Sequence, residues 1–147
     1  MKAIDIMTKK PIFLNTKSTV SQAAKLMKDK GIGSIPIEED DKLVGMVTDR
    51  DITVRVTGES RDPNKTLVKD IMTSHILYCH ETDEIESVLN NMGEQQIRRL
   101  PVLNENEKLV GEISMGDIAV HIKDQEGLTR VGKTMSQICT PSKKHAS

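Results

Sequence analysis

The chain has 147 residues, with 21 basic and 22 acidic side chains and a formal net charge of −1. One Phe, one Tyr and no Trp leave few aromatic side chains for stacking bases, and no long basic run is present, so nucleic acid is not expected as a partner. No apolar stretch approaches the roughly 20 residues that cross a bilayer, and no signal-peptide segment opens the chain, so we expect a soluble cytoplasmic protein without a membrane span.

One sequence pattern occurs twice along the chain. The opening Asp5-Ile6-Met7-Thr8 recurs as Asp70-Ile71-Met72-Thr73, and later apolar, Gly, Pro and acidic positions repeat in the same order. Such ordered self-similarity indicates two copies of one folding unit. Because halves of this size bury too little surface to be stable alone, we expect the copies to share a core.

In the first copy, an extended apolar run at residues 12–14 follows the opening segment. A helix is predicted next, because Ser18 or Thr19 can serve as its N-cap, apolar residues follow at steps of three and four, and Gly31 can end it. The second copy repeats this arrangement after the apolar run 76–79.

In the second copy Thr82 is the predicted N-cap, and the apolar face of the helix runs from Ile85 to Met92. Gly93 is expected to weaken the last turn by roughly 1 kcal/mol. The first helix of each copy is therefore predicted at equivalent positions.

Two short apolar runs joined by a polar turn follow each helix and predict a hairpin. The predicted strands span residues 34–37 and 43–47 in the first copy and residues 100–103 and 109–113 in the second. A final helix is expected to begin near Asp49 and near Met115, with Thr48 and Ser114 as N-caps. Each copy is thus predicted as strand, helix, hairpin and helix.

The segments outside the copies have a different composition. Polar and helix-breaking residues mark 57–65 as a linker. After the second copy, the spacing of Leu128, Val131, Met135 and Ile138 is compatible with a short helix that covers the pair or docks on another subunit, and residues 140–147 are expected to be disordered. The expected boundaries are 1–56 for the first copy, 57–65 for the linker, 66–123 for the second copy and 124–147 for the tail.

The segment whose side chains suit ligand binding spans residues 45–51 and recurs at residues 111–117. In each, a hydroxyl residue, Thr48 or Ser114, precedes by three positions an aspartate at the start of a helix. A helix start attracts phosphate, and a nearby carboxylate can accept hydrogen bonds from ribose hydroxyls, so the pattern suits a ribonucleotide. The same spacing is also an ordinary helix-capping signal, which is the favoured interpretation for a single copy. Duplication strengthens the functional interpretation.

The whole repeat resembles a cystathionine β-synthase (CBS) domain, and residues 1 to about 122 resemble a tandem CBS pair, or Bateman module. The matching features are the Asp-Ile-Met-Thr openings, the Ile-Pro and Leu-Pro strands and both Gly-x-x-Thr/Ser-x-x-Asp segments. The resemblance implies an α/β (α+β) fold in which two β-α-β-β-α units pack with pseudo-twofold symmetry and leave two clefts that bind adenine nucleotides.

The resemblance also implies which residues line each cleft. In the family, the opening Thr and the apolar strand of one copy face the base, while the Ser/Thr-x-x-Asp segment of the other copy holds ribose and phosphate. One cleft would then contain Thr8, Ile12, Ile32, Ser114 and Asp117. The other would contain Thr73, Leu77, Ile97, Thr48, Arg50 and Asp51.

Arginines distinguish the two clefts. Arg98 and Arg99 stand where the first copy has Gly and Ser, so the cleft of Asp117 is predicted to be the stronger phosphate site. Arg50 is expected to serve the other cleft. The alternative is that the arginine pair meets surface acids such as Glu94 or Glu112.

No catalytic or metal-binding pattern is apparent. Cys79 and Cys139 lack Cys-x-x-Cys spacing and are expected to be free thiols, and the four histidines lack the spacing of metal ligands. No nucleophile is paired with a base, and no Gly-x-x-x-x-Gly-Lys phosphate loop occurs. We therefore expect a protein without enzymatic activity, cofactor or metal.

The leading hypothesis is a regulatory module that binds AMP, ADP or ATP and transmits its ligand state to an unknown partner protein. The resemblance also implies a homodimer formed through helices. Two alternatives stay open. One is a protein-interaction scaffold with degenerate clefts, and the other is a CBS pair that binds S-adenosylmethionine or an NAD-type ligand.

Overall fold

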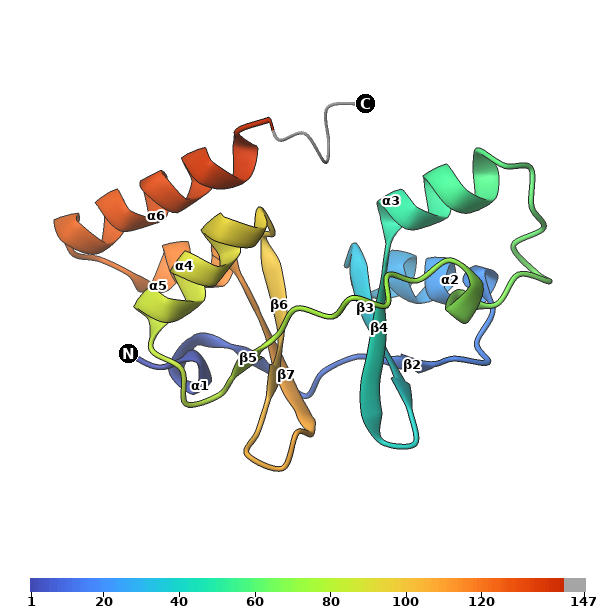
Figure 1. Cartoon of the computed structure of the whole chain (residues 1–147), viewed down its shortest axis with the longest axis horizontal. Helices are drawn as coiled ribbons and strands as arrows, with labels where there is room; N and C mark the ends of the chain where they lie inside the picture. The colour runs from blue at the N-terminus through green and yellow to red at the C-terminus, as the bar shows by residue number, and fades with distance from the viewer. Residues whose placement is uncertain (142–147) are drawn as a thin grey trace. The chain divides into compact units, whose positions relative to one another are not determined.

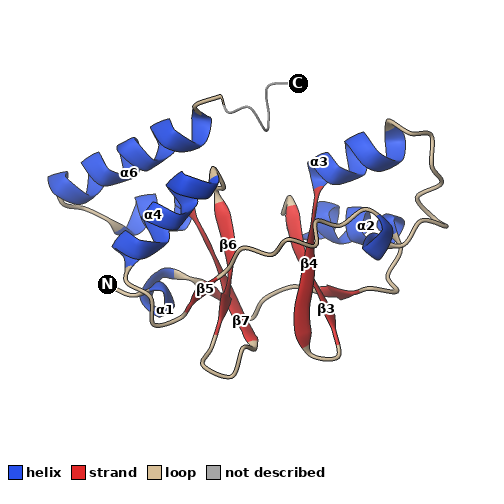
Figure 2. Ribbon diagram, in the orientation of Figure 1, coloured by secondary structure: helices blue, strands red, loops and turns tan. Residues whose placement is uncertain are grey.

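A computed structural model describes residues 1–141 and divides the chain into two compact units (Figure 1). Unit 1 contains residues 1–11 and the chain from residue 77 onward, and unit 2 contains residues 12–76. Each unit combines a small sheet with helices, as the colouring in Figure 2 shows. The mixed helix and strand content confirms the predicted fold class.

Unit 2 is built on a three-stranded sheet with the order β2-β3-β4. The hairpin β3–β4 is antiparallel, and β2 pairs in parallel with β3. The elements of this unit are β2 (Leu14–Asn15), α2 (Val20–Lys30), β3 (Ser34–Glu39), β4 (Lys42–Thr48), α3 (Asp49–Ile52), the π-helix η1 (Thr53–Thr57) and the 3₁₀ helix η2 (Val68–Asp70).

Unit 1 is built on a four-stranded sheet with the order β1-β7-β6-β5. Its hairpin β6–β7 is antiparallel, β5 pairs in parallel with β6, and β1 pairs antiparallel with β7. The elements are α1 (Ala3–Ile6), β1 (Thr8–Lys9), β5 (Cys79–His80), α4 (Ile85–Gln95), β6 (Arg99–Leu103), β7 (Leu109–Ser114), α5 (Met115–His121) and α6 (Gln125–Cys139).

The predicted hairpins and most helix boundaries are confirmed. Thr19 caps α2 by accepting a hydrogen bond from the Gln22 amide at 3.1 Å, and α2 ends at Gly31 with a left-handed φ of 64°. Thr48 and Ser114 are the N-caps of α3 and α5, as the spacing predicts. Local capping chemistry therefore determines where these helices begin and end.

The predicted cap of α4 is wrong. The residue before α4 is Glu84, whose side chain makes no capping hydrogen bond, and Thr82 lies in the preceding turn. The amide of Ile85 instead donates to the carbonyl of Met1 at 3.0 Å. A backbone carbonyl distant in sequence thus satisfies an amide that local capping was expected to satisfy.

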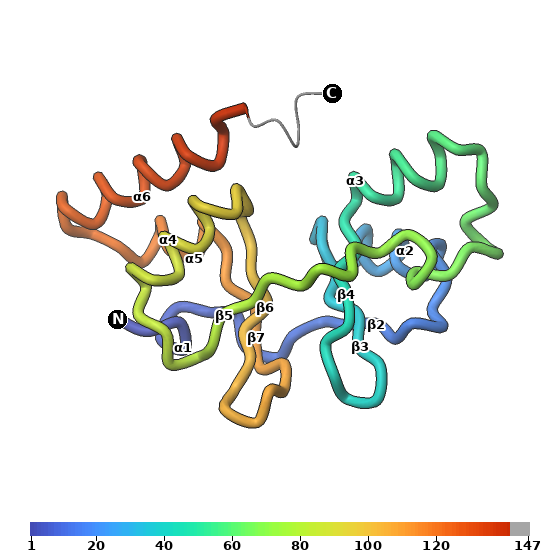
Figure 3. Tube along the Cα trace, in the orientation of Figure 1, coloured from blue at the N-terminus to red at the C-terminus, as the bar shows by residue number. Residues whose placement is uncertain are grey.

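The opening segment of each copy packs in the unit that holds the hairpin of the other copy (Figure 3). In unit 1, Thr8 lies opposite Glu112, and the amide of Ala3 donates to the carbonyl of Asp83 at 2.9 Å. In unit 2, Thr73 pairs with Met46 through two backbone hydrogen bonds of 3.0 and 2.9 Å. Neither unit is complete without residues from both copies.

Two glycines make room for the opening segments. A Cβ at Gly111 would lie 2.7 Å from the Thr8 carbonyl oxygen and 2.8 Å from the Met7 sulfur. A Cβ at Gly45 would collide with the Met72 sulfur and lie 3.1 Å from the Thr73 carbonyl oxygen. The glycine of each Gly-x-x-Thr/Ser-x-x-Asp motif is therefore required by the close approach of an opening segment.

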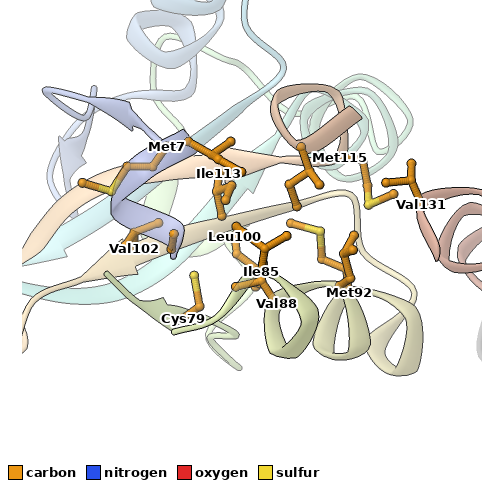
Figure 4. Close-up of a cluster of buried hydrophobic side chains, with 14 of the residues drawn as sticks. Met7, Cys79, Ile85, Val88, Met92, Leu100, Val102, Ile113, Met115 and Val131 are labelled. Atoms are coloured by element: carbon orange, nitrogen blue, oxygen red, sulfur yellow. The ribbon is translucent and has the colours of Figure 1, made fainter. Parts of the chain in front are cut away.

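Each unit has its own aliphatic core. In unit 1, Figure 4 shows side chains of the hairpin, including Leu100 and Ile113, beside Val88 and Met92 of α4. The opening segment adds Ala3, Ile6 and Met7 to this cluster. The core of unit 2 includes Val20, Ile35, Val47, Val68 and Ile71, of which the last two belong to the second copy's opening segment. The exchanged segments are therefore parts of both cores.

The tail forms a helix, as its apolar spacing predicts. In α6, Val131 and Thr134 are buried, and Met135 and Ile138 pack against the core of unit 1. The expected disorder of residues 140–147 falls largely outside the described residues, but it is wrong for Thr140, whose hydroxyl donates to the Ser136 carbonyl at 2.6 Å. Within the described part of the chain, neither α6 nor any other helix combines the length and apolar character needed to cross a membrane.

Substitution of Gly111 tests the role of the close approach. We expect Gly111→Ala to lower the free energy of unfolding by about 2–3 kcal/mol, because the new methyl group meets the backbone of Thr8. Gly116→Ala is the matched control. A Cβ at Gly116 would lie 3.6 Å from the Ser114 hydroxyl oxygen, an ordinary van der Waals contact. Urea unfolding measures both variants. Equal stability of Gly111→Ala and Gly116→Ala would contradict the proposed constraint.

Candidate functional site

The motif residues of unit 1 form a reciprocal pair at the start of α5. The Asp117 amide donates to the Ser114 hydroxyl at 3.0 Å, and the Ser114 amide donates to Asp117 Oδ2 at 2.9 Å. The second carboxylate oxygen, Oδ1, forms no hydrogen bond with residues 1–141. Capping therefore uses one carboxylate oxygen of Asp117, and the other has no hydrogen-bond donor within residues 1–141.

One face of the unit 1 sheet gathers polar side chains next to this pair. Thr8 lies opposite Glu112, and Arg99 lies opposite Ser114. Residues directly opposite on adjacent strands share a face, as do residues two apart on one strand. Thr8, Arg99, Glu112 and Ser114 are therefore on the same face, which combines two hydroxyls, a carboxylate and a guanidinium.

The two neighbouring arginines have different partners. Arg99 Nη1 lies 3.5 Å from Glu112 Oε2, which confirms for Arg99 the alternative of pairing with a nearby acid. Arg98 Nη2 donates to the Cys139 sulfur at 3.9 Å. Both arginines thus have protein partners in this structure, and their preference for phosphate stays a prediction.

Unit 2 contains an equivalent arrangement. The Asp51 amide donates to the Thr48 hydroxyl at 3.0 Å, and the Thr48 amide donates to Asp51 Oδ2 at 2.9 Å. Thr73 pairs with Met46 on the neighbouring strand, as Thr8 pairs with Glu112 in unit 1. Arg50 is exposed, and its guanidinium has no hydrogen bond or ion pair within residues 1–141.

Only part of each predicted set lies within a single unit. Thr8 shares unit 1 with Ser114 and Asp117, but Ile12 and Ile32 lie in unit 2. Thr73 shares unit 2 with Thr48, Arg50 and Asp51, but Leu77 and Ile97 lie in unit 1. Ile32 packs against the core of unit 2, whereas Leu77 and Ile97 pack against that of unit 1. Packing of these apolar residues explains their assignment to the units.

Sequence reasoning did not identify what stands opposite the opening threonines. Glu112 and Met46 occupy equivalent positions, each directly after the glycine that admits the opening segment. One carries a carboxylate, which is paired with Arg99, and the other a thioether, so the two faces differ in their polar groups. In the sequence, these two residues can be recognised as the ones that directly follow the motif glycines.

The two cysteines differ in chemical availability. Burial, and secondarily the negative charge of Asp83, raises the pKa of Cys79 to about 12. Cys139 is exposed, and both thiols are free. Within residues 1–141, no group of three or more His, Cys, Asp or Glu side chains is arranged to hold a metal ion.

Two surface hollows of unit 1 lie away from the motif residues. One has a volume of about 460 Å³ and is lined by residues that include Met1, Glu84 and Arg130. The other has a volume of about 560 Å³ and lies between α4 and α6, with Asn90 and Lys133 among its lining residues. Neither contains Ser114 or Asp117, so the candidate site is defined by the motif residues and not by these hollows.

Comparison with known families decides the identity of the fold. Residues 3–58 and 68–124 each match the model of the CBS domain. The chain belongs to the CBS-domain family. The matched segments make it a CBS pair, each of whose two units combines residues of both CBS domains.

Two relatives match this CBS pair over most of their own length. The CBS domain-containing protein YhcV of Bacillus subtilis is 37% identical over 122 residues, covering 83% of this chain and 86% of YhcV. Hypoxic response protein 1 of Mycobacterium tuberculosis is 34% identical over 140 residues, covering 95% of this chain and 94% of the relative.

Solved CBS structures have the same fold. Hypoxic Response Protein I, in a crystal structure with two coordinated zinc ions, has a TM-score of 0.77 and 36% identity, covering 84% of this chain and 100% of that one. The CBS pair of protein MJ0100, in complex with 5′-methylthioadenosine and S-adenosyl-L-methionine, has a TM-score of 0.72 and 28% identity, covering 82% and 94%.

Thiol labelling tests the contrast between the cysteines. At pH 8 we expect a thiol-specific reagent to modify Cys139 within minutes and Cys79 only after unfolding, because the buried thiol stays protonated and shielded. Mass spectrometry of the labelled protein counts the modified sites. The variants Cys139→Ser and Cys79→Ser assign them, and rapid modification of Cys79 in the folded protein would contradict its burial.

Proposed function

We propose that this CBS pair is a non-catalytic regulatory module that binds adenosine nucleotides and transmits its ligand state to a partner protein. The observation that carries the proposal is the duplicated arrangement of an opening threonine and a Thr/Ser-x-x-Asp motif, contributed by different copies. Arrangement of the same side chains in two units is better explained by ligand binding than by capping alone.

The aspartates supply the ribose contacts in this proposal. Asp117 and Asp51 each hold a backbone amide with Oδ2, which fixes the orientation of the carboxylate. The remaining oxygen can accept hydrogen bonds from the vicinal hydroxyls of a ribose, and bonds to a charged acceptor are stronger than neutral ones. Rigid positioning lowers the entropic cost of binding.

Nearby arginines support a phosphorylated ligand. Arg50 is exposed beside the Thr48–Asp51 motif, and Arg98 contacts only a thiol through its side chain within the described residues. A guanidinium exchanges such weak partners readily for the oxygens of a phosphate. AMP, ADP and ATP therefore fit both the ribose and the phosphate requirements.

A second candidate is an adenosine ligand with a sulfonium group. The CBS pair of MJ0100 is in complex with 5′-methylthioadenosine and S-adenosyl-L-methionine, which contain the same ribose. In unit 1, Glu112 places a carboxylate on the sheet face that carries Thr8 and Ser114. A cationic ligand offers this carboxylate a partner in place of Arg99, whose Nη1 lies 3.5 Å from it.

Adenosine nucleotides and two free thiols are both typical of the cytoplasm, where we place the protein.

A homodimer is part of the same proposal. Val54 and Val120, which occupy equivalent places on the final helices of the two copies, are 47% and 63% exposed. Burial of these side chains against a second copy would remove apolar surface from water.

Calorimetry tests the proposed ribose contact. We expect AMP, ADP or ATP to bind, and Asp117→Asn to weaken binding at its site about tenfold or more, because the amide keeps an oxygen for the Ser114 amide but loses the charge. Asp83→Asn is the matched control, since Asp83 also accepts a backbone hydrogen bond, from His80 at 2.9 Å. Binding equally reduced in both variants, or in neither, would refute the assignment of Asp117.

Light scattering tests the proposed dimer. We expect size-exclusion chromatography with light scattering to give twice the mass of one chain for the wild type at micromolar concentration. Val120→Asp is expected to shift the protein toward the monomer, because a buried charge opposes association. A wild type that is monomeric throughout the concentration range would contradict the dimer.

A further inference from the structure

The helix α6 follows only the second copy, and several differences between the copies lie where α6 packs. The first helices α2 and α4 end in the same way, since the Ile32 and Ile97 amides donate to the carbonyls of Met27 and Met92 at 3.1 and 3.0 Å. Equivalent positions on α2 and α4 can therefore be compared directly. The comparison shows which residues of the second copy differ where they contact α6.

Two differences fit α4 to the body of α6. Gly93 of α4 replaces a lysine of α2 and is buried, and a Cβ there would collide with the Gln137 side chain. Glu86 replaces a serine, and its carboxylate lies 3.3 Å from Arg130 of α6. The glycine expected to weaken α4 thus leaves room for the Gln137 side chain of α6.

A third difference concerns the end of α6. Gln96 has a left-handed φ of 55° at the position where the first copy has Gly31, also left-handed. A residue with a side chain has a conformational cost in this left-handed region. Gln96 offsets this cost with its side-chain amide, which donates to the carbonyls of Gln137 and Thr140 at 3.0 and 2.6 Å. The last turn of α6 is therefore held by the residue that ends α4.

The fourth difference connects that turn to the candidate site. Arg98 stands where the first copy has Gly33, and its side chain reaches the Cys139 sulfur in the last turn of α6. Its backbone carbonyl accepts the amide of Met115, the residue between Ser114 and Gly116 in the motif, at 2.9 Å. Arg98 thus touches both the last turn of α6 and the loop that carries Asp117.

We propose that the last turn of α6 and the phosphate of a ligand at the Ser114–Asp117 motif compete for Arg98. A neutral thiol 3.9 Å away is a weak acceptor, whereas a phosphate forms charge-assisted hydrogen bonds with a guanidinium. Ligand binding in unit 1 therefore draws Arg98 from Cys139 and loosens residues 137–140. This inference rests on the proposed function and identifies α6 as the element that reports the occupancy of unit 1.

Amide hydrogen exchange on the full chain tests the competition. With saturating AMP, we expect the amides of residues 137–140 to exchange about threefold faster or more, because the turn loses one of its two side-chain anchors. Adenosine is the matched control ligand, since it has the ribose but no phosphate, and should leave the exchange unchanged. Gln96→Gly, which restores the residue of the first copy, should accelerate the same amides without any ligand.

Binding and exchange are measured on the same samples, so that the two proposals fail separately. Calorimetric binding of AMP with unchanged or slower exchange of residues 137–140 would overturn the competition and leave the proposed function intact. In Arg98→Gly, measured at AMP concentrations that calorimetry shows to saturate the variant, residues 137–140 should exchange equally fast with and without AMP, and a remaining AMP response would overturn the competition. Absence of AMP binding would overturn the proposed function and the competition with it.

Discussion

The backbone pairing of each opening segment with the β-hairpin of the other copy is the constraint on which both units depend. In unit 1, β1 completes the sheet while Ala3, Ile6 and Met7 enter the core. In unit 2, the Val68 and Thr73 amides donate to carbonyls of the first copy at 2.8 and 2.9 Å. Each copy therefore needs the other to satisfy its backbone and bury its apolar side chains.

The same pairing places the candidate site residues. Because the opening segment passes directly over a motif glycine, its threonine lies beside the strand that ends in the capping hydroxyl. The site is thereby composed of both copies in each unit. A mutation that displaces an opening segment would be expected to damage a core and a binding site together.

The two interpretations of the Thr/Ser-x-x-Asp motif are compatible in physical terms. Capping uses one oxygen of each carboxylate and the proposed ligand contact uses the other, so one aspartate can serve both roles. The capping hydrogen bonds of Asp51 and Asp117 hold their carboxylates in a fixed orientation. Gln96 likewise has two roles, because it ends α4 and its side chain holds the last turn of α6.

Local signals were sufficient to predict the hairpins, the caps Thr19, Thr48 and Ser114, and the helical character of the tail. The cap of α4 could not be predicted, because it comes from the carbonyl of Met1, far away in sequence. Arg98 was predicted as a phosphate ligand from its neighbours in sequence, but its contact with Cys139 depends on how α6 packs. Tertiary contacts thus decided the features that periodicity and spacing left open.

The central claim is that a ligand is held jointly by residues of both copies within one unit. A crystal structure of the chain grown with AMP tests it most directly. The account predicts ribose hydroxyls within hydrogen-bond distance of Oδ1 of Asp117 or Asp51, with the opening threonine of the other copy in contact with the same nucleotide. A nucleotide bound elsewhere, or one held by residues of a single copy, would contradict the account.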